Sequence, residues 1–426
     1  MRIEVPWGES TVMVEVDAHR VAGVLGANVQ RAVDPSRILR EAVTAPGAEF
    51  EDFLECARSP LLVVVNDGTR PTPSADVLAE LRFALEAWAA VPGNELAFVI
   101  ATGTHRAASA EEIDRIFGSD LARSHARRIF SHDAKDTGRL VHLGRTARGT
   151  EVWVNNLLAE ASSVLAINSV EPHYFAGYTG GRKSVFPGLA GYETVWANHR
   201  LSMERGAEHL VLAGNPVHED LEESLALGLA GKQVYSVQLV LDNDHRIGFA
   251  AAGGLHETFR EAVAVADRQF VLELPRREQV VVAAAPYPMD CNFYQTNKAI
   301  QSGALAVEDG GILIVVSDCP QGLGENQTLY DMLAAADSPE EALERAGGEE
   351  YVLGVQQAVR VAGILKRADV WVVSSLPDEQ VRAMCMTPFP SVQNALDEAL
   401  RRQGAGARAL FLTEASITVP RVRDCA

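Results

Sequence analysis

Short runs of aliphatic residues alternate with longer amphipathic stretches along the chain. In the first half, the apolar runs at 61–66 (LLVVVN), 96–102 (LAFVIAT) and 164–169 (VLAINS) are short and rich in β-branched residues. Such runs are typical of buried strands in parallel sheets. Helical spacing of apolar residues at 74–90 and 110–117 lies between them. The alternation predicts an α/β fold with mostly parallel sheets.

The same alternation continues in the second half, after a basic pair at 276–277. By the same criteria we expect strands at 280–285, 312–317, 370–374 and 409–412, and helices at 297–308, 339–346, 355–367 and 392–403.

The length of the chain predicts more than one domain. It has 426 residues, whereas single hydrophobic cores stop growing at roughly 250–300 residues. We predict an N-terminal domain over 1–272 and a C-terminal domain over 278–409, with the active site in the cleft between them. The tail at about 410–426 is expected to pack back on the first domain.

Composition narrows the class of protein. The chain is 47% hydrophobic and 22% charged, which is ordinary for a globular protein, and its formal net charge is -19. Nucleic acids and anionic membranes attract basic surfaces, so neither is an expected partner. The start MRIEVPWGES lacks the pattern of a signal peptide, and five scattered cysteines without a C-x-x-C favour reduced thiols. We expect a cytoplasmic protein.

Three of the predicted strands are followed by polar loops. They are Asp67-Gly68-Thr69-Arg70-Pro71, Gly103-Thr104-His105-Arg106 and Glu171-Pro172-His173. Ligands of open α/β sheets bind beyond the carboxyl ends of the strands. Each loop by itself is also explained by turn-forming residues. Together, with a histidine in two of them, they predict one site.

The segment 171–199, EPHYFAGYTGGRKSVFPGLAGYETVWANH, is the most informative run of the chain. Its turn GYTGGRKS resembles the phosphate loop G-x-x-x-x-G-K-[ST], but Arg182 stands where that template needs glycine, which argues against a nucleoside triphosphatase. Backbone N–H groups of such a turn still suit one phosphate. An ordinary glycine-rich turn is the alternative. The cofactor-binding candidates here are Gly177, Thr179, Gly180, Gly181, Arg182, Lys183 and Ser184.

Four side chains have chemistry of their own. Lys183 suits a charge partner for phosphate or, if desolvated, a covalent link. His105 and His173 are candidates for general acid–base catalysis. His199 has no second ligand at a metal-binding spacing, so spacing alone does not separate a metal ligand from a core histidine.

In the second half, Tyr294-Gln295-x-x-Lys298 opens a predicted helix. Gln295 and Lys298 share a helical face, and an amide with a cation suits a carboxylate substrate. A solvated helix start explains the same residues.

Taken together, these motifs resemble the nickel-dependent lactate racemase family, which includes racemases and epimerases of other 2-hydroxy acids. The resemblance runs from VPWGES through DGTRP, ATGTHR and the 171–199 segment to the helix at 294–298. It implies a nickel pincer nucleotide: a pyridinium-3,5-bisthiocarboxylic acid mononucleotide that holds nickel through carbon and sulfur. Dedicated cofactor-synthesis enzymes would be partners of such a protein.

The resemblance also implies roles for the candidate residues. Lys183 would carry the cofactor covalently through a thioamide, and His199 would be the nickel ligand that the protein supplies. The turn at 177–184, with Asp67, would hold the phosphate and ribose region. His105 and His173 would be the acid–base pair. The side chains that would position the substrate, a small 2-hydroxy carboxylate, are Arg70, Tyr294, Gln295 and Lys298; Arg70 also lies beside the cofactor.

The implied reaction avoids a carbanion. The C2 hydrogen would leave as hydride to the cofactor while one histidine takes the hydroxyl proton, giving a planar 2-oxo acid. Hydride returned to the opposite face, with a proton from the other histidine, inverts the centre.

One departure concerns the substrate. Lactate-acting members of the family carry a tryptophan ahead of the helix at 355–367, and residues 351–357 (YVLGVQQ) contain none. Lactate, malate or a larger 2-hydroxy acid are therefore all candidates. The alternative functions are a nicotinamide-dependent oxidoreductase, which the absence of an early G-x-G-x-x-G argues against, and a non-catalytic nucleotide- or metal-binding homologue. The sequence leaves the oligomeric state open.

Overall fold

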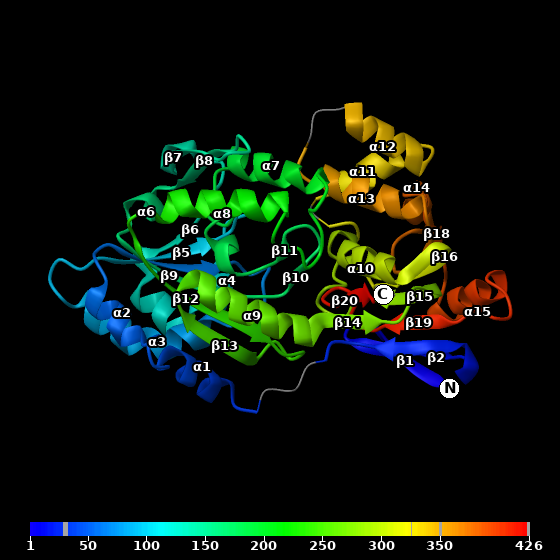
Figure 1. Ribbon diagram of the computed structural model, residues 1–426, viewed down its shortest axis with the longest axis horizontal. Helices are drawn as coiled ribbons and strands as arrows, with labels where there is room; N and C mark the ends of the chain where they lie inside the picture. The colour runs from blue at the N-terminus through cyan, green and yellow to red at the C-terminus, as the bar shows by residue number, and fades with distance from the viewer. Residues whose placement is uncertain (29–32, 325, 349–351, 424–426) are drawn as a thin grey trace. The chain divides into compact units, whose positions relative to one another are not determined.

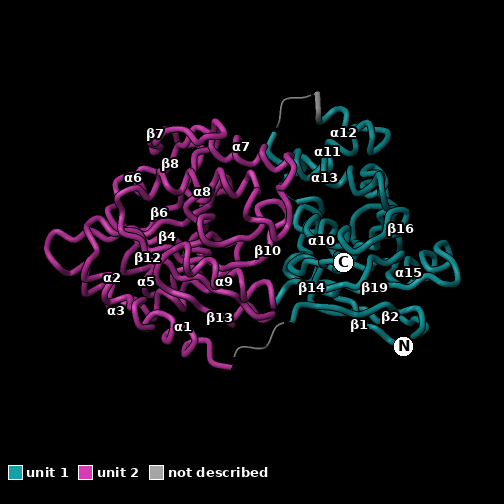
Figure 2. Tube along the Cα trace, in the orientation of Figure 1, with its two compact units in different colours: residues 1–28, 269–426 teal, residues 29–268 magenta. Residues whose placement is uncertain are grey.

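The computed structural model describes residues 1–28, 33–324, 326–348 and 352–423 (Figure 1). The chain divides into two compact units (Figure 2). Unit 1 consists of residues 1–28 and 269–426, and unit 2 of residues 29–268. The first 28 residues thus belong with the C-terminal part of the chain, which corrects the predicted domain over 1–272.

Unit 2 is built on a six-stranded sheet in the order β13-β12-β9-β4-β5-β6. All neighbours are parallel except β12 and β13. The chain adds β5 and β6 on one side of β4, and β9, β12 and β13 on the other. Strand order therefore reverses between β4 and β9. The strands are β4 (Leu61–Asn66), β5 (Leu96–Ala101), β6 (Ile129–Ser131), β9 (Ser163–Ser169), β12 (Gln233–Leu241) and β13 (Ile247–Gly253).

Side chains of this sheet alternate between two cores. In β9, Leu165 and Ile167 belong to one core, and Val164 and Ala166 belong to the other. Helices α1 to α5 contribute to the first core, and α6 to α8 to the second (Figure 1). The helices of unit 2 are α1 (Pro35–Val43), α2 (Phe50–Cys56), α3 (Ser74–Ala89), α4 (Ala110–Phe117), α5 (Ser119–Ser124), α6 (Asn156–Glu160), α7 (Tyr192–Arg200), α8 (Pro216–Leu229) and α9 (Leu255–Phe270).

Two short antiparallel pairs complete unit 2. Strands β7 (Leu140–Arg145) and β8 (Glu151–Asn155) form one, and β10 (Pro172–His173) and β11 (Gly177–Tyr178) form the other. The second pair folds part of the 171–199 segment back on itself, with His173 opposite Gly177.

Unit 1 contains a parallel sheet in the order β18-β17-β16-β15-β19-β3. Helices α10 to α14 contribute to the core on one face; α15 and the hairpin β1–β2 contribute to the core on the other. The elements are β1 (Arg2–Trp7), β2 (Ser10–Glu15), β3 (Val21–Leu25), β15 (Glu278–Ala284), β16 (Val307–Val316), β17 (Asp369–Val373), β18 (Thr387–Pro388), β19 (Ala409–Leu412), α10 (Phe293–Ala306), α11 (Thr328–Ala334), α12 (Pro339–Gly348), α13 (Val355–Leu365), α14 (Asp378–Ala383) and α15 (Val392–Arg402).

The end of the chain also stays within unit 1. Strand β20 (Val419–Val422) pairs in parallel with β14 (Val271–Leu274). The tail pairs with residues 21–25 and 271–274, which lie almost entirely within the predicted 1–272 domain, but these segments belong to unit 1 rather than to unit 2. Residues 424–426 lie outside the described residues. The domain assignment was wrong because β3 pairs with β19 and β14 pairs with β20. These strands are distant in the sequence, and no local sequence pattern predicts their pairing.

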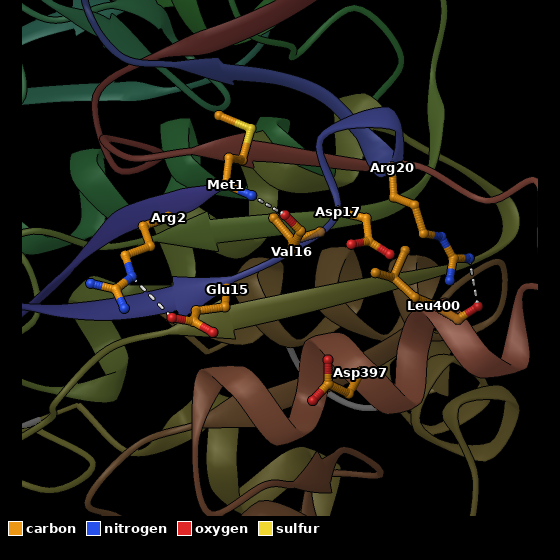
Figure 3. A pocket seen from close by; sticks show the side chains of 8 residues that line it. All are labelled: Met1, Arg2, Glu15, Val16, Asp17, Arg20, Asp397 and Leu400. Carbon is orange, nitrogen blue, oxygen red and sulfur yellow. Dashed lines mark hydrogen bonds and ion pairs between the residues drawn. The ribbon is translucent and has the colours of Figure 1, made fainter.

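A pocket of about 560 Å³ lies in unit 1 between the hairpin β1–β2 and α15 (Figure 3). Its charged groups are largely bonded within the fold. Arg2 pairs with Glu15, and Arg20 donates to the backbone carbonyl of Leu400 at 3.0 Å. None of the lining residues is a candidate site residue. Within the described part of the chain, no helix has both the length and the apolar character needed to span a bilayer.

Candidate functional site

The three polar loops follow the carboxyl ends of β4, β5 and β9, where the order of strands in the sheet of unit 2 reverses. Asp67 directly follows β4, Thr102 follows β5, and Val170 follows β9. Because β4 and β9 are adjacent and strand order reverses between them, this is the topological switch point, where α/β sheets bind their ligands.

His105 and Asp67 form a close pair across this edge. His105 Nδ1 lies 2.7 Å from Asp67 Oδ2, and the Thr69 hydroxyl donates to Asp67 Oδ1 at 2.7 Å. Burial acts to raise the pKa of Asp67, but the hydrogen bond and charge of His105, with Thr69 and Arg70, outweigh it and hold the pKa below its ordinary value. The ionised carboxylate places the His105 proton on Nδ1, so that Nε2 carries the lone pair.

Asp67 was predicted to hold the ribose and phosphate region of a nucleotide. In the structure its two oxygens bind His105 and Thr69, and it is 8% exposed. The sequence did not indicate this partnership. The signal available was an aspartate and a histidine at the ends of two strands predicted to be neighbours.

Arg70 is joined to the third loop. Its Nη1 donates to Glu171 Oε1 at 3.2 Å, and both side chains are mostly buried. The Thr72 hydroxyl lies 2.8 Å from the Ser169 hydroxyl, also linking the β4 and β9 loops. Glu171 was not among the predicted site residues. The sequence indicated a role for it only through its position next to Pro172 and His173.

His173 uses its Nδ1 within the hairpin. Backbone N–H groups of Ala176 and Phe175 donate to Nδ1 at 3.3 and 3.5 Å. In the neutral ring the proton is then on Nε2. His173 is thus the complement of His105: one neutral ring presents an acceptor at Nε2, and the other a donor.

Phe175 connects the chemically active side chains of the 171–199 segment. Its ring centroid lies 4.5 Å from that of His173 and 5.2 Å from that of His199, and the Lys183 amine is 5.7 Å from its centre. The sequence does not distinguish Phe175 from a core residue, because an aromatic side chain beside apolar neighbours is typical of a hydrophobic core. The structure brings His173, Lys183 and His199 together around it.

The glycines of the 177–184 turn are explained by packing. Gly177, Gly180 and Gly181 all have positive φ, of 75°, 74° and 53°. A Cβ on Gly177 would lie 2.3 Å from the Val211 carbonyl oxygen, and one on Gly180 would lie 2.4 Å from the Val170 side chain. The N–H of Gly181 donates to Gln238 Oε1 at 2.9 Å. These observations favour the ordinary-turn alternative for the glycines themselves; phosphate binding by the turn stays a prediction.

Arg182 and Lys183 have different surroundings. The Arg182 side chain is fully buried, and its Nη2 donates to the carbonyl of Ala176 at 2.7 Å. Its predicted contact with a cofactor phosphate is therefore not supported, because the guanidinium is enclosed by the protein. Lys183 is half-buried beside Phe175, and Ser184 is buried. Thr179 is also buried, and its N–H donates to the Glu171 carbonyl at 2.8 Å.

His199 has the protonation state of a metal ligand. It lies near the end of α7, and its buried Nδ1 has no hydrogen-bond partner among the described residues. Burial, followed by the positive charge of Lys183, lowers the pKa of His199 to about 3, against the opposing effect of the Val195 backbone. The ring is neutral at pH 7, as metal binding requires.

The fit to a metal-bearing cofactor rests on these observations. Across the described ranges, no three His, Cys, Asp or Glu side chains are arranged to hold a metal ion. A single neutral imidazole beside a half-buried lysine suits a metal whose other ligands belong to a larger group. The residues present therefore fit a cofactor that brings most of its own ligands.

The predicted substrate residues of unit 1 share one face of α10. Asn292 caps this helix by accepting the Gln295 N–H at 3.0 Å, so Tyr294 and Gln295 lie in its first turn. Both are half-buried, as is Lys298, whereas Thr296 and Asn297 are buried. A carboxylate-binding role for this face stays a prediction.

The segment that lacks the expected tryptophan lies at the start of α13. Gln356 and Gln357 are buried there, each 5% exposed. Tyr351 lies outside the described residues. Buried amides therefore occupy the start of this helix.

Comparisons with known proteins agree over nearly the whole chain. Residues 7–210 match the family model "Lactate racemase N-terminal domain", and residues 274–419 match "Lactate racemase C-terminal domain". The lactate racemase of Thermoanaerobacterium thermosaccharolyticum is 26% identical over 404 residues, covering 92% of this chain and 93% of the relative. That of Lactiplantibacillus plantarum is 27% identical over 426 residues, covering 97% and 98%.

The fold gives the same result. The solved structure of the lactate racemase apoprotein from T. thermosaccharolyticum superposes with a TM-score of 0.90 at 25% identity, covering 99% of this chain and all of that chain. A protein from Thermotoga maritima shares the fold, with a TM-score of 0.67 at 18% identity over 92% of this chain and 99% of that one. The chain therefore belongs to the lactate racemase family and is an isomerase of the racemase class.

Proposed function

We propose that this protein inverts the C2 centre of a 2-hydroxy carboxylate with a nickel pincer nucleotide attached to Lys183. The observation that carries the proposal is the cluster around Phe175, which gathers a protonatable His173, a half-buried Lys183 and a neutral His199. The Asp67–His105 pair lies at the same switch point.

His199 would be the nickel ligand from the protein, because its imidazole stays neutral far below pH 7. Lys183 would carry the cofactor through a thioamide. When bound, the cofactor supplies an electrophilic centre that takes up the C2 hydride and gives it back. The turn at 177–184 would enclose the cofactor through its backbone rather than through the Arg182 side chain.

The two histidines divide the proton transfers. His105, with its lone pair on Nε2, accepts the proton of the substrate hydroxyl as C2 loses hydride. His173, with its proton on Nε2, would donate that proton to the oxygen when hydride returns to the opposite face, and exchange with water would then return a proton to His173 and remove one from His105. The complementary tautomers allow the pair to start with one acid and one base, which a reversible inversion needs. For the other enantiomer the same transfers would run in reverse, starting from the protonation state in which His105 carries the extra proton.

Arg70 would bind the substrate carboxylate. Glu171 engages Nη1 of the guanidinium, and the Nε–Nη2 edge has the fork geometry that binds a carboxylate through two N–H groups. Tyr294, Gln295 and Lys298 of unit 1 would complete the substrate contacts. The named relatives act on lactate; with no tryptophan at 351–357, we propose lactate, malate or a larger 2-hydroxy acid for this protein.

The test is production in the cytoplasm together with the cofactor-synthesis enzymes. Intact mass should show an adduct that Lys183→Ala abolishes, and metal analysis should show about one nickel per chain that His199→Ala loses. A chiral assay on lactate, malate and larger 2-hydroxy acids then identifies the substrate. Fully loaded protein without exchange on any acid would favour the non-catalytic alternative, and tight binding of free NAD without nickel would favour the oxidoreductase.

A further inference from the structure

Arg182 is a buried arginine next to the proposed attachment residue. Its side chain is 0% exposed, and its guanidinium lies 5.3 Å from the centre of the Phe259 ring. Removing an arginine from water is costly unless hydrogen bonds and charges compensate it. Its Nε and Nη1 have no hydrogen-bond partner among the described residues, so the compensation comes from the hydrogen bonds of Nη2 and from the nearest carboxylate. These contacts indicate what the side chain does.

Those contacts join the two halves of the catalytic segment. Arg182 Nη2 donates to the carbonyls of Ala176 at 2.7 Å and Tyr178 at 3.4 Å, the residues on either side of Gly177. Gly177 is the residue paired with His173 across the β10–β11 hairpin. The backbone of Arg182, in turn, leads directly into Lys183. One side chain thus fixes the strand opposite His173 relative to the turn that carries Lys183.

The carboxylate nearest the guanidinium is Glu222 of α8. Glu222 Oε1 lies 3.9 Å from Arg182 Nε, and the same carboxylate faces His218 at 3.8 Å and His256 at 3.5 Å. These distances are those of charge partners rather than of short hydrogen bonds. Glu222 therefore provides a negative charge for the guanidinium from helix α8. This helix packs in the same core of unit 2 as α6 and α7.

We infer that Arg182 is a positioning residue that sets the place of His173 relative to Lys183, and that it does not bind the cofactor phosphate. The inference rests on the proposed function of these two residues. On this inference Arg182 acts through the position that it gives to the backbone around Gly177, and not through its charge. A lysine at this position would keep the charge, but its single ammonium would have to serve both carbonyls and Glu222, which the guanidinium contacts through separate nitrogens.

The test compares Arg182→Lys and Arg182→Met with wild type, each produced with the cofactor-synthesis enzymes. Intact mass gives the fraction of chains that carry the adduct. Initial rates are measured on the 2-hydroxy acid that the wild type racemises, and dividing them by that fraction gives the rate per loaded chain. We expect both variants to form the adduct, with kcat per loaded chain lower by about 10- to 100-fold and KM changed by less than about threefold. Arg246→Lys, a paired arginine elsewhere in unit 2, is the control and should match wild type.

The outcomes separate the alternatives. A purely structural role lowers Tm but leaves kcat per loaded chain within about twofold of wild type, which overturns the inference. A phosphate ligand loses the adduct in Arg182→Met and regains normal kcat in Arg182→Lys, which also overturns it. If Arg182→Lys does not fold, Glu222→Gln decides: a fall in kcat per loaded chain of about threefold or more supports positioning, and no fall refutes it. Inactive wild type would instead refute the proposed function.

Discussion

At the scale of single residues, the proposed acid–base roles depend on the tautomers of His105 and His173, which are determined by the neighbouring groups. Asp67 fixes the proton of His105 on Nδ1, whereas backbone N–H groups leave the proton of neutral His173 on Nε2. Two chemically identical side chains thereby acquire opposite capacities. The sequence identifies both histidines, but their tautomers follow from contacts across strand ends.

Asp67→Asn should impair catalysis more than folding. The amide removes the negative charge that holds the His105 proton on Nδ1, and a positioned general base is worth about 10²–10⁴-fold in rate. We expect kcat to fall within that range while the adduct on Lys183 still forms. Rates per loaded chain measure the effect, with Thr69→Val as a milder control because it removes one hydrogen bond to the same carboxylate. Wild-type kcat in Asp67→Asn would contradict the assigned role.

His199 should make the cofactor-free protein sensitive to acid. Its folded pKa of about 3 lies below the ordinary 6.5, so the unfolded chain binds a proton there that the folded chain does not. Stability from the neutral ring is complete above pH 6.5 and decreases as the pH falls from there toward 3. His199→Gln should therefore lose less stability than wild type between pH 7.5 and pH 5. Urea unfolding at the two pH values tests this, and equal losses would refute it.

At the scale of elements, the turn at 177–184 shows that one glycine-rich motif can have two explanations. Three glycines, an arginine and a lysine suit a phosphate loop. The structure requires the glycines because positive φ and close neighbours leave no room for a Cβ, and it encloses Arg182. A bound phosphate and close packing of the protein both require glycine at these positions. The sequence alone therefore does not distinguish between the two causes.

Gly177→Ala should be costly for this reason. Its φ of 75° is unfavourable for alanine, and the new Cβ would approach the Val211 carbonyl to 2.3 Å. Backbone strain and overpacking together predict a loss of about 2–5 kcal/mol of unfolding free energy. Gly214→Ala is the matched control, because its φ is 78° but nothing lies within 4 Å of the added Cβ. It should lose only the backbone part, about 1–2 kcal/mol. Equal losses in urea unfolding would exclude the packing explanation.

The elements themselves were largely predictable from local pattern. The runs at 61–66 and 164–169 form β4 and β9, because strands buried on both faces need uninterrupted aliphatic residues. The helix α10 begins at Phe293, close to the start that the motif at Tyr294 predicted and four residues before the start at 297 that the apolar pattern predicted. The apolar pattern missed the first turn because the cap by Asn292 depends on one side chain that also suits a loop. Phe175 was missed because its role follows from what it contacts rather than from its chemistry.

At the scale of the whole molecule, the N-terminal and C-terminal segments of the chain belong to the same unit. Strand β3 pairs with β19, and the hairpin β1–β2 covers one face of the sheet of unit 1. The length of the chain predicted two domains, which is correct in number. The pairing of residues near 25 with residues near 410 places the first 28 residues in unit 1, and no local pattern in those residues indicates this. The first 28 residues are therefore part of the unit that carries Tyr294 and Lys298.

Ile3→Ala should test which unit these residues stabilise. Ile3 is 3% exposed in the core shared by β1, β15 and β16, and its truncation should cost about 2–5 kcal/mol. Each unit has its own cores, so the loss should appear as faster amide hydrogen exchange in β15 and β19, with β4 and β9 unchanged. Ile167→Ala, fully buried in unit 2, should give the reverse pattern. Faster exchange of β4 and β9 in Ile3→Ala would instead restore the N-terminal domain over 1–272.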